Sequence, residues 1–104
     1  MGTNQNIEDM FFILRNKEYM LISTPVHYHS FVNFIAGYEL GFCLSMGEPI
    51  LSFNEWLMEK EEKRFSSNWP SYILEKNNGD EKDSKKMLVD YFEMYIKQVS
   101  SLNS

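Results

Sequence analysis

The sequence predicts an all-α fold, a single compact domain of about five helices packed around a central apolar helix at residues 25–46. Four segments repeat apolar residues at spacings of three and four, the period of a helix, and little of the chain alternates with period two. The chain has 104 residues, of which 43% are hydrophobic, so it can build one core and is too apolar for a disordered segment. We expect residues 1–104 to form this domain, with residues 1–5 and 101–104 frayed.

The first helix is expected at residues 7–17, where four apolar side chains share one face. Acidic side chains in its first turn and basic side chains in its last turn suit the helix dipole. Residues 18–24 fit either an extension of this helix or a short strand-like segment, and their sequence leaves both open.

The second helix is the most apolar segment of the chain. Thr24 as its cap and Pro25 at its first position predict where it starts. Apolar residues cover nearly its whole circumference, so we expect it to be buried on several sides. Gly37 and Gly41 each cost roughly 1 kcal/mol of helix propensity, so we expect them to let a neighbouring backbone approach closely.

A capping box predicts the start of the third helix. Ser52 and Glu55 have the Ser-x-x-Glu spacing in which side chain and backbone satisfy each other at a helix N-terminus. Phe53, Trp56 and Leu57 define the inner face of this helix.

Two further helices complete the fold. The fourth follows Ser67 or Asn68, with Pro70 in its first turn. After a turn at residues 77–80, the fifth helix is expected at residues 81–100. Its predicted buried set is Leu88, Tyr91, Phe92, Tyr95 and Val99. The charged residues on its outer face alternate in sign and are interpreted as solvated: Lys86, Asp90, Glu93 and Lys97.

Charge and composition restrict the class of partner. The net charge of −5 disfavours direct nucleic-acid binding, because phosphate contacts supply most of that affinity. It permits a basic protein partner, although ordinary solubility explains it equally well. A single cysteine favours a reducing compartment, and no apolar run is long enough to span a membrane. The N-terminus lacks signal-peptide features, so we expect a cytoplasmic monomer without membrane contact.

The chain contains no recognisable catalytic or metal-binding constellation. His27 and His29 would point about 200° apart on a helix and have no third ligand at suitable spacing. Cys43 lies in an apolar helix, where a packing role is favoured over thiolate chemistry. We therefore expect no metal, no cofactor and no enzymatic activity.

Acidic residues are the candidate partner-binding residues. Glu55, Glu59 and Glu62 are spaced i, i+4 and i+7 on the outer face of the third helix, and Glu48 lies upstream. Like charges at this spacing destabilise an isolated helix, so the stripe is either a solvated face softened by nearby lysines or a contact for a basic partner.

Three more carboxylates complete the candidate set. Glu39 lies on an apolar helix, where an unpaired charge would be costly, so we expect it to pair with Arg15 or a lysine. A partner-facing role for Glu39 is the alternative. Asp80 and Asp83, in the turn before the last helix, are the next candidates.

The order of the core residues resembles a known family. The pattern is Phe31-x-x-Phe-Ile-x-Gly-Tyr-Glu39, then Phe53-x-x-Trp-Leu57, then Trp69-Pro and a final amphipathic helix. Over residues 7–99 it resembles small helical immunity proteins of bacterial polymorphic and contact-dependent growth inhibition toxin systems. The resemblance implies an antitoxin that binds and blocks a cognate toxin, usually a nuclease, in the producing cell's cytoplasm. An adaptor or regulatory subunit is the alternative.

Overall fold

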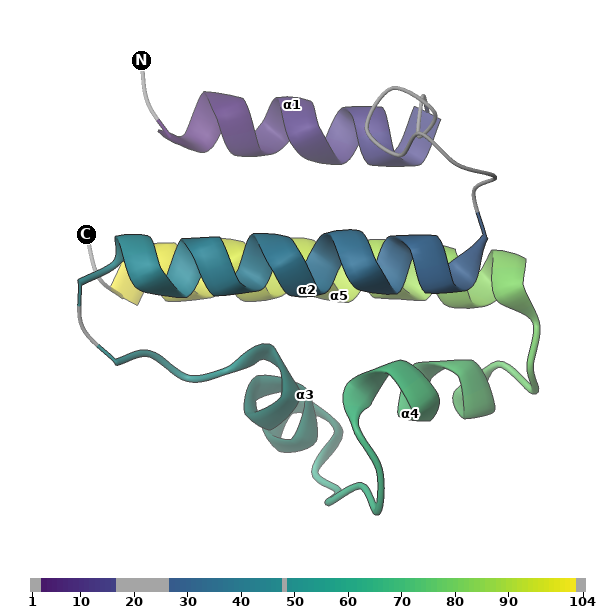
Figure 1. Cartoon of the computed structure of the whole chain (residues 1–104). Helices are drawn as coiled ribbons and strands as arrows, with labels where there is room; N and C mark the ends of the chain where they lie inside the picture. Colours follow the sequence, from purple (N-terminus) through teal and green to yellow (C-terminus); the bar gives the residue numbers. More distant parts are fainter. Residues whose placement is uncertain (1–2, 17–26, 48, 103–104) are drawn as a thin grey trace.

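The computed structural model describes residues 3–16, 27–47 and 49–102, with side chains described over residues 8–16, 27–47 and 49–100. Its helices, in chain order, are α1 (Thr3–Asn16), α2 (Tyr28–Ser45), α3 (Phe53–Glu61), α4 (Trp69–Lys76) and α5 (Glu81–Leu102) (Figure 1). No strand occurs within these residues. The predicted all-α fold with five helices is confirmed.

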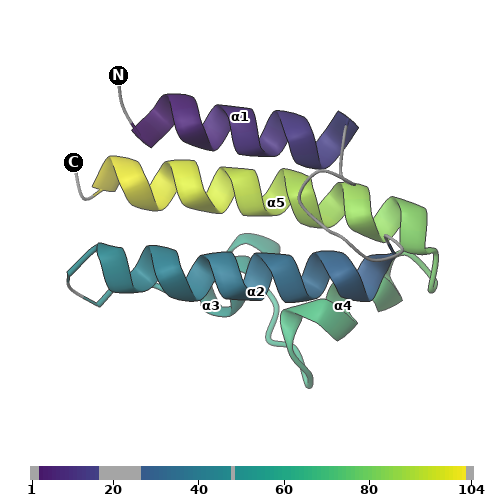
Figure 2. The same cartoon turned by 45° about the horizontal axis from the view of Figure 1, so that its top comes forward.

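The helix at the centre of the fold is α5, and the prediction of a central helix at residues 25–46 is wrong. α5 packs against each of the other four helices. Figure 2 shows α1 and α2 running along it, with α3 and α4 beyond α2. α5 fills this role because its buried stripe is wide. It comprises Leu88, Val89, Phe92, Tyr95, Ile96 and Val99.

α2 covers only one side of α5. Tyr28, Phe31 and Ile35 are its buried residues, while Leu40 and Leu44 are exposed. The expected close approach at Gly37 and Gly41 is also wrong, because no atom of another helix lies within 4 Å of the position that a Cβ would take at either glycine. The apolar residues around the whole circumference of α2 therefore did not result in burial on several sides.

The start of α2 differs from the prediction. The helix begins at Tyr28, with His27 as its N-cap in an extended conformation. The backbone N–H of Tyr28 donates to Glu81 Oε1 at 3.1 Å, so a carboxylate from α5 satisfies this helix end. The predicted cap and first position at residues 24–25, like the alternatives for residues 18–24, lie outside the described residues.

The starts of α3 and α4 follow the predicted caps. Ser52 Oγ accepts the backbone N–H of Glu55 at 3.2 Å, which is the first half of the predicted capping box. Asn68 is the N-cap of α4, and the N–H of Trp69 donates to Asn54 Oδ1 on α3 at 2.7 Å. This bond ties the two short helices together.

Aromatic side chains form the centre of the core, and Phe53 lies among them. Its ring centroid is 5.1 Å from that of Trp69, 5.2 Å from Phe92 and 5.4 Å from Tyr95. Such tilted and edge-on contacts add to the burial of the rings themselves. The predicted buried set of α5 is confirmed except for Tyr91, which is half-buried.

The face of α5 predicted to be solvated instead forms ion pairs with α1. Arg15 lies 2.8 Å from Asp90 and 2.6 Å from Glu93, and Lys97 lies 3.0 Å from Glu93 and 3.1 Å from Glu8. Partly exposed pairs contribute little each, but their arrangement sets how α1 lies along α5. Across the described ranges, no helix has both the length and the apolar composition of a membrane span.

Candidate functional site

His27, His29 and Cys43 are the residues that the sequence raises for metal or nucleophile chemistry. No group of three or more His, Cys, Asp or Glu residues in the described part of the chain can hold a metal ion. His27 and His29 are both exposed. Cys43 is half-buried, with its Sγ 3.9 Å from the hydroxyl oxygen of Tyr95. The candidates that remain are surfaces.

Some of the acidic residues proposed from the sequence form hydrogen bonds within the fold, and others are exposed. Glu39 Oε2 accepts the backbone N–H of Phe53 at 2.8 Å, so this carboxylate holds the N-terminus of α3. Its expected pairing with Arg15 is wrong, because Arg15 bonds to α5. Asp80 Oδ1 accepts the N–H of Asp83 at 2.8 Å in the first turn of α5. Glu39 and Asp80 therefore have structural roles.

Glu55, Glu59 and Glu62, which we call the acidic edge, remain exposed as predicted. Together they line a shallow depression of about 330 Å³. Its other lining residues are Met58, Lys63 and Arg64. None of the three carboxylates forms an ion pair with a described residue. Asp83 lines a different depression, beside α4 and α5, and Glu48 lies outside the described residues.

The core holds the acidic edge in place. Phe53, Trp56 and Leu57 on the opposite face of α3 are at most 5% exposed. The indole N–H of Trp56 also donates to Gln98 on α5 at 3.0 Å. A partner would therefore meet carboxylates on a helix whose position is already set, which lowers the ordering cost of binding.

Glu62 has an unusual backbone conformation. It follows the last turn of α3 with φ of 54° and ψ of 44°, the left-handed region in which helices usually place glycine. A side chain in this region costs about 1–2 kcal/mol relative to the right-handed conformation. The chain nevertheless has a carboxylate there, at the end of the acidic edge.

Glu61, next to the acidic edge, points inward instead. It accepts hydrogen bonds from the hydroxyls of Tyr72 and Tyr91, both at 2.8 Å, and pairs with Lys76. Burial raises the pKa of Glu61, but hydrogen bonds from Lys76 and the two tyrosines outweigh it and lower the pKa to about 2. This network joins α3, α4 and α5, and sequence analysis missed it because its members are 11 to 30 residues from Glu61 along the chain.

A second surface, also missed from the sequence, is the uncovered side of α2, which we call the α2 outer face. Its exposed residues are His29, Asn33, Ala36, Gly37, Leu40, Gly41 and Leu44. Leu40 is 64% exposed and Leu44 is 74% exposed, more than any other large hydrophobic side chain described. Apolar side chains grouped in this way mark contact surfaces more often than isolated ones do.

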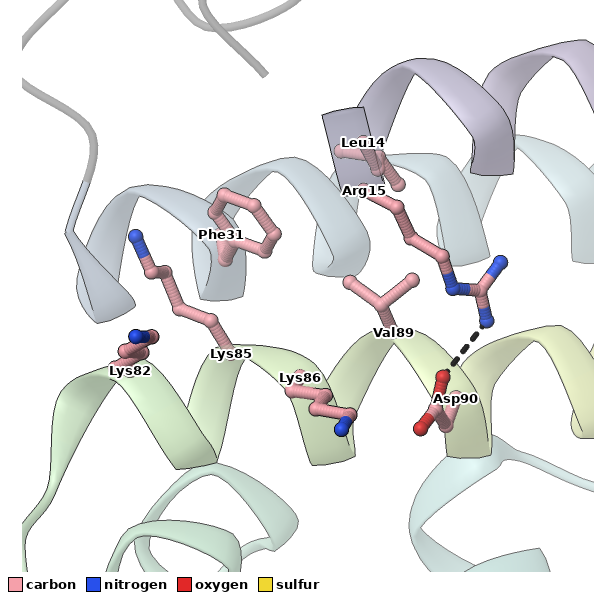
Figure 3. A pocket seen from close by; sticks show the side chains of 8 residues that line it. All are labelled: Leu14, Arg15, Phe31, Lys82, Lys85, Lys86, Val89 and Asp90. Carbon is pink, nitrogen blue, oxygen red and sulfur yellow. Dashed lines mark hydrogen bonds and ion pairs between the residues drawn. The ribbon is translucent and has the colours of Figure 1, made fainter. Parts of the chain in front are cut away.

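A groove of about 600 Å³ lies where α1, α2 and α5 meet (Figure 3). Three lysines on α5, at positions 82, 85 and 86, line it, and the Arg15–Asp90 ion pair lies at one side. Lys85 Nζ lies 5.4 Å from the ring centroid of Phe31. Leu14, Phe31 and Val89 lie in its wall and are each 2% exposed.

Comparisons with protein-family models, curated proteins and solved structures gave no match to this chain. The resemblance to immunity proteins therefore stays a prediction based on the sequence pattern.

Proposed function

We propose that this chain is an immunity protein, a non-catalytic inhibitor that binds a basic partner protein through the acidic edge of α3. The partner expected from the sequence resemblance is a nuclease toxin with a cationic active-site cleft. The observation that carries the proposal is the exposure of Glu55, Glu59 and Glu62 and their lack of ion-pair partners among the described residues. These carboxylates lie on and just after a helix anchored in the core.

Three other carboxylates provide a contrast. Glu61, Glu93 and Asp90 are all engaged by basic side chains of the same chain. The nearby lysines do not neutralise the acidic edge in the same way. Lys60 Nζ lies 5.9 Å from the ring of Trp56, and Lys63 Nζ lies 5.8 Å from the ring of Tyr72. These cation–π contacts direct both ammonium groups toward aromatic faces.

Inhibition would be by occlusion. Exposed carboxylates attract a basic cleft and raise the association rate, and a partner's Arg or Lys side chain entering the depression would pair with them. The side chain of Met58, half-buried in the same depression, offers apolar contact to the stem of that residue. A nuclease cleft covered in this way cannot bind phosphate.

The test begins with capture of the partner from the native host by the tagged chain, followed by titration of the partner's nuclease activity. Reversal of all three carboxylates, Glu55→Lys, Glu59→Lys and Glu62→Lys, should weaken binding by about 100-fold or more. The helical circular dichroism spectrum should be unchanged, because the inner face of α3 is untouched.

Two single variants provide a matched comparison. Glu59→Lys changes a carboxylate on the acidic edge, whereas Glu75→Lys makes the same charge change on an exposed part of α4. We expect only the first to weaken inhibition beyond the effect of net charge. Equal effects, or wild-type inhibition by the triple variant, would place the interface elsewhere.

The same capture experiment distinguishes the immunity proposal from the alternative that the sequence leaves open, an adaptor or regulatory subunit. A partner with its own activity that is retained in the complex favours an adaptor. A partner that is toxic alone and inactive when bound supports the immunity proposal.

A further inference from the structure

The α2 outer face is an apolar surface that nothing in the described structure covers. Leu40 and Leu44 lie one turn apart on the same side of the helix, at 64% and 74% exposure. The other exposed large hydrophobic side chains, Phe12 and Met94, lie on α1 and α5. α2 has 18 residues and is therefore about 27 Å long, enough to pack against a second helix over several turns.

The charge of α2 indicates what can pack there. Glu39 is the only Asp, Glu, Lys or Arg in α2, and that carboxylate is bonded to the N-terminus of α3. With His29 neutral, as it is counted in the net charge of −5, the outer face carries no charge. Two copies of an acidic protein repel each other over most of their surfaces, and this face lets them meet without bringing like charges together.

The shape of the α2 outer face also favours contact with a second copy of the chain. A two-fold contact uses the same surface on both copies, so that surface must complement itself. Gly37 and Gly41 carry no side chain and leave recesses, where an added Cβ would meet nothing within 4 Å apart from the adjoining residues and the backbone of α2; Leu40 and Leu44 are exposed beside them. Two α2 helices can therefore cross closely, with leucines of each copy over the recesses of the other.

We propose that the α2 outer face binds a second copy of this chain and forms a two-fold dimer through α2. The inference goes beyond the proposed function, because the acidic edge lies on α3 and takes no part in this contact. One helix from each copy gives an interface smaller than the roughly 1,600 Å² of a standard stable complex. The dimer is therefore reversible and forms with rising protein concentration, and a dilute sample is monomeric as the sequence analysis expects.

Sedimentation velocity of the wild-type chain between about 1 µM and 1 mM tests the proposal, with dimer expected to accumulate across this range. The double variant Leu40→Gln with Leu44→Gln should raise the dissociation constant by about tenfold or more, because four exposed leucines are lost from the dimer. A matched double variant, Phe12→Gln with Met94→Gln, removes exposed apolar side chains on other helices and should dimerise like the wild type.

A third variant tests the recesses. Gly37→Leu with Gly41→Leu should weaken dimerisation while leaving the monomer folded, because both positions face open space. A wild-type chain that stays monomeric at 1 mM would overturn the proposal. Loss of the dimer in the Phe12/Met94 variant but not in the Leu40/Leu44 variant would do the same. A monomeric wild type whose Leu40/Leu44 variant fails to bind the captured partner would show that a different protein covers this face.

Discussion

Replacing Glu61 with glutamine should destabilise the fold more than any other neutralisation of an acidic residue in α3. The side chain of Glu61 is 12% exposed and bonds to Tyr72, Tyr91 and Lys76 from two other helices. Glutamine keeps an oxygen that can accept from the tyrosines. It loses the charge, however, and can turn its amide toward the ammonium of Lys76.

The size of the effect follows from the pKa. Folding lowers the pKa of Glu61 from 4.5 to about 2, and each such unit corresponds to about 1.36 kcal/mol. The full difference corresponds to about 3 kcal/mol. Lys76 is 39% exposed, so solvent screens part of the interaction, and we expect Glu61→Gln to cost about 2–3 kcal/mol at pH 7. In a chain of this length, that loss lowers the melting temperature by about 10–20 °C.

The pH dependence distinguishes this mechanism from a simple loss of packing. Because the pKa of Glu61 is lower in the folded state, its stabilisation is complete above pH 4.5 and is lost as the pH falls from 4.5 toward 2. The difference in unfolding free energy between wild type and Glu61→Gln should therefore shrink to less than half by about pH 3.

Urea denaturation from pH 7 to pH 3 measures this difference. Glu59→Gln is the matched control, since it makes the same charge change at an exposed carboxylate on the same helix and should alter stability by less than about 0.5 kcal/mol. A Glu61→Gln variant as stable as wild type at pH 7 would refute the reasoning. A difference that stays constant down to pH 3 would show that packing, and not the charge, accounts for the loss.

Two further predictions concern α2 and α3. Gly37→Ala should stabilise the monomer by about 0.5–1 kcal/mol, because alanine favours the helix and no other helix obstructs its methyl group. A lowered urea midpoint in dilute protein would contradict this prediction. Glu39→Ala should cost about 1–2 kcal/mol of stability, because the N–H of Phe53 loses its acceptor. Glu39→Gln should cost less, because an oxygen remains to accept the bond. Equal losses of stability in thermal denaturation would argue against this hydrogen bond.

Local chemistry in the sequence determined where α3, α4 and α5 begin. The Ser52 cap, the Asn68 cap and the start of α5 at Glu81 all lie where the sequence places them. Helical periodicity and capping act over about four residues, so they can be inferred from neighbours along the chain. The same reasoning identified the acidic edge, because residues spaced i, i+4 and i+7 share a face on any helix.

Only the tertiary structure decided which helix occupies the centre and which carboxylates stay free. α2 is the more apolar helix, yet α5 is central because its wide buried stripe can meet helices on several sides while α2 packs on one. Glu61 and Glu62 are adjacent, but Glu61 is the last residue of α3 and Glu62 follows it in the left-handed conformation. The carboxylate of Glu61 enters a network with α4 and α5, and that of Glu62 stays exposed. Glu39 likewise accepts a hydrogen bond from the backbone of α3 and does not pair with Arg15. Each of these outcomes depends on groups brought together by packing, and the spacing of residues along the chain does not contain that information.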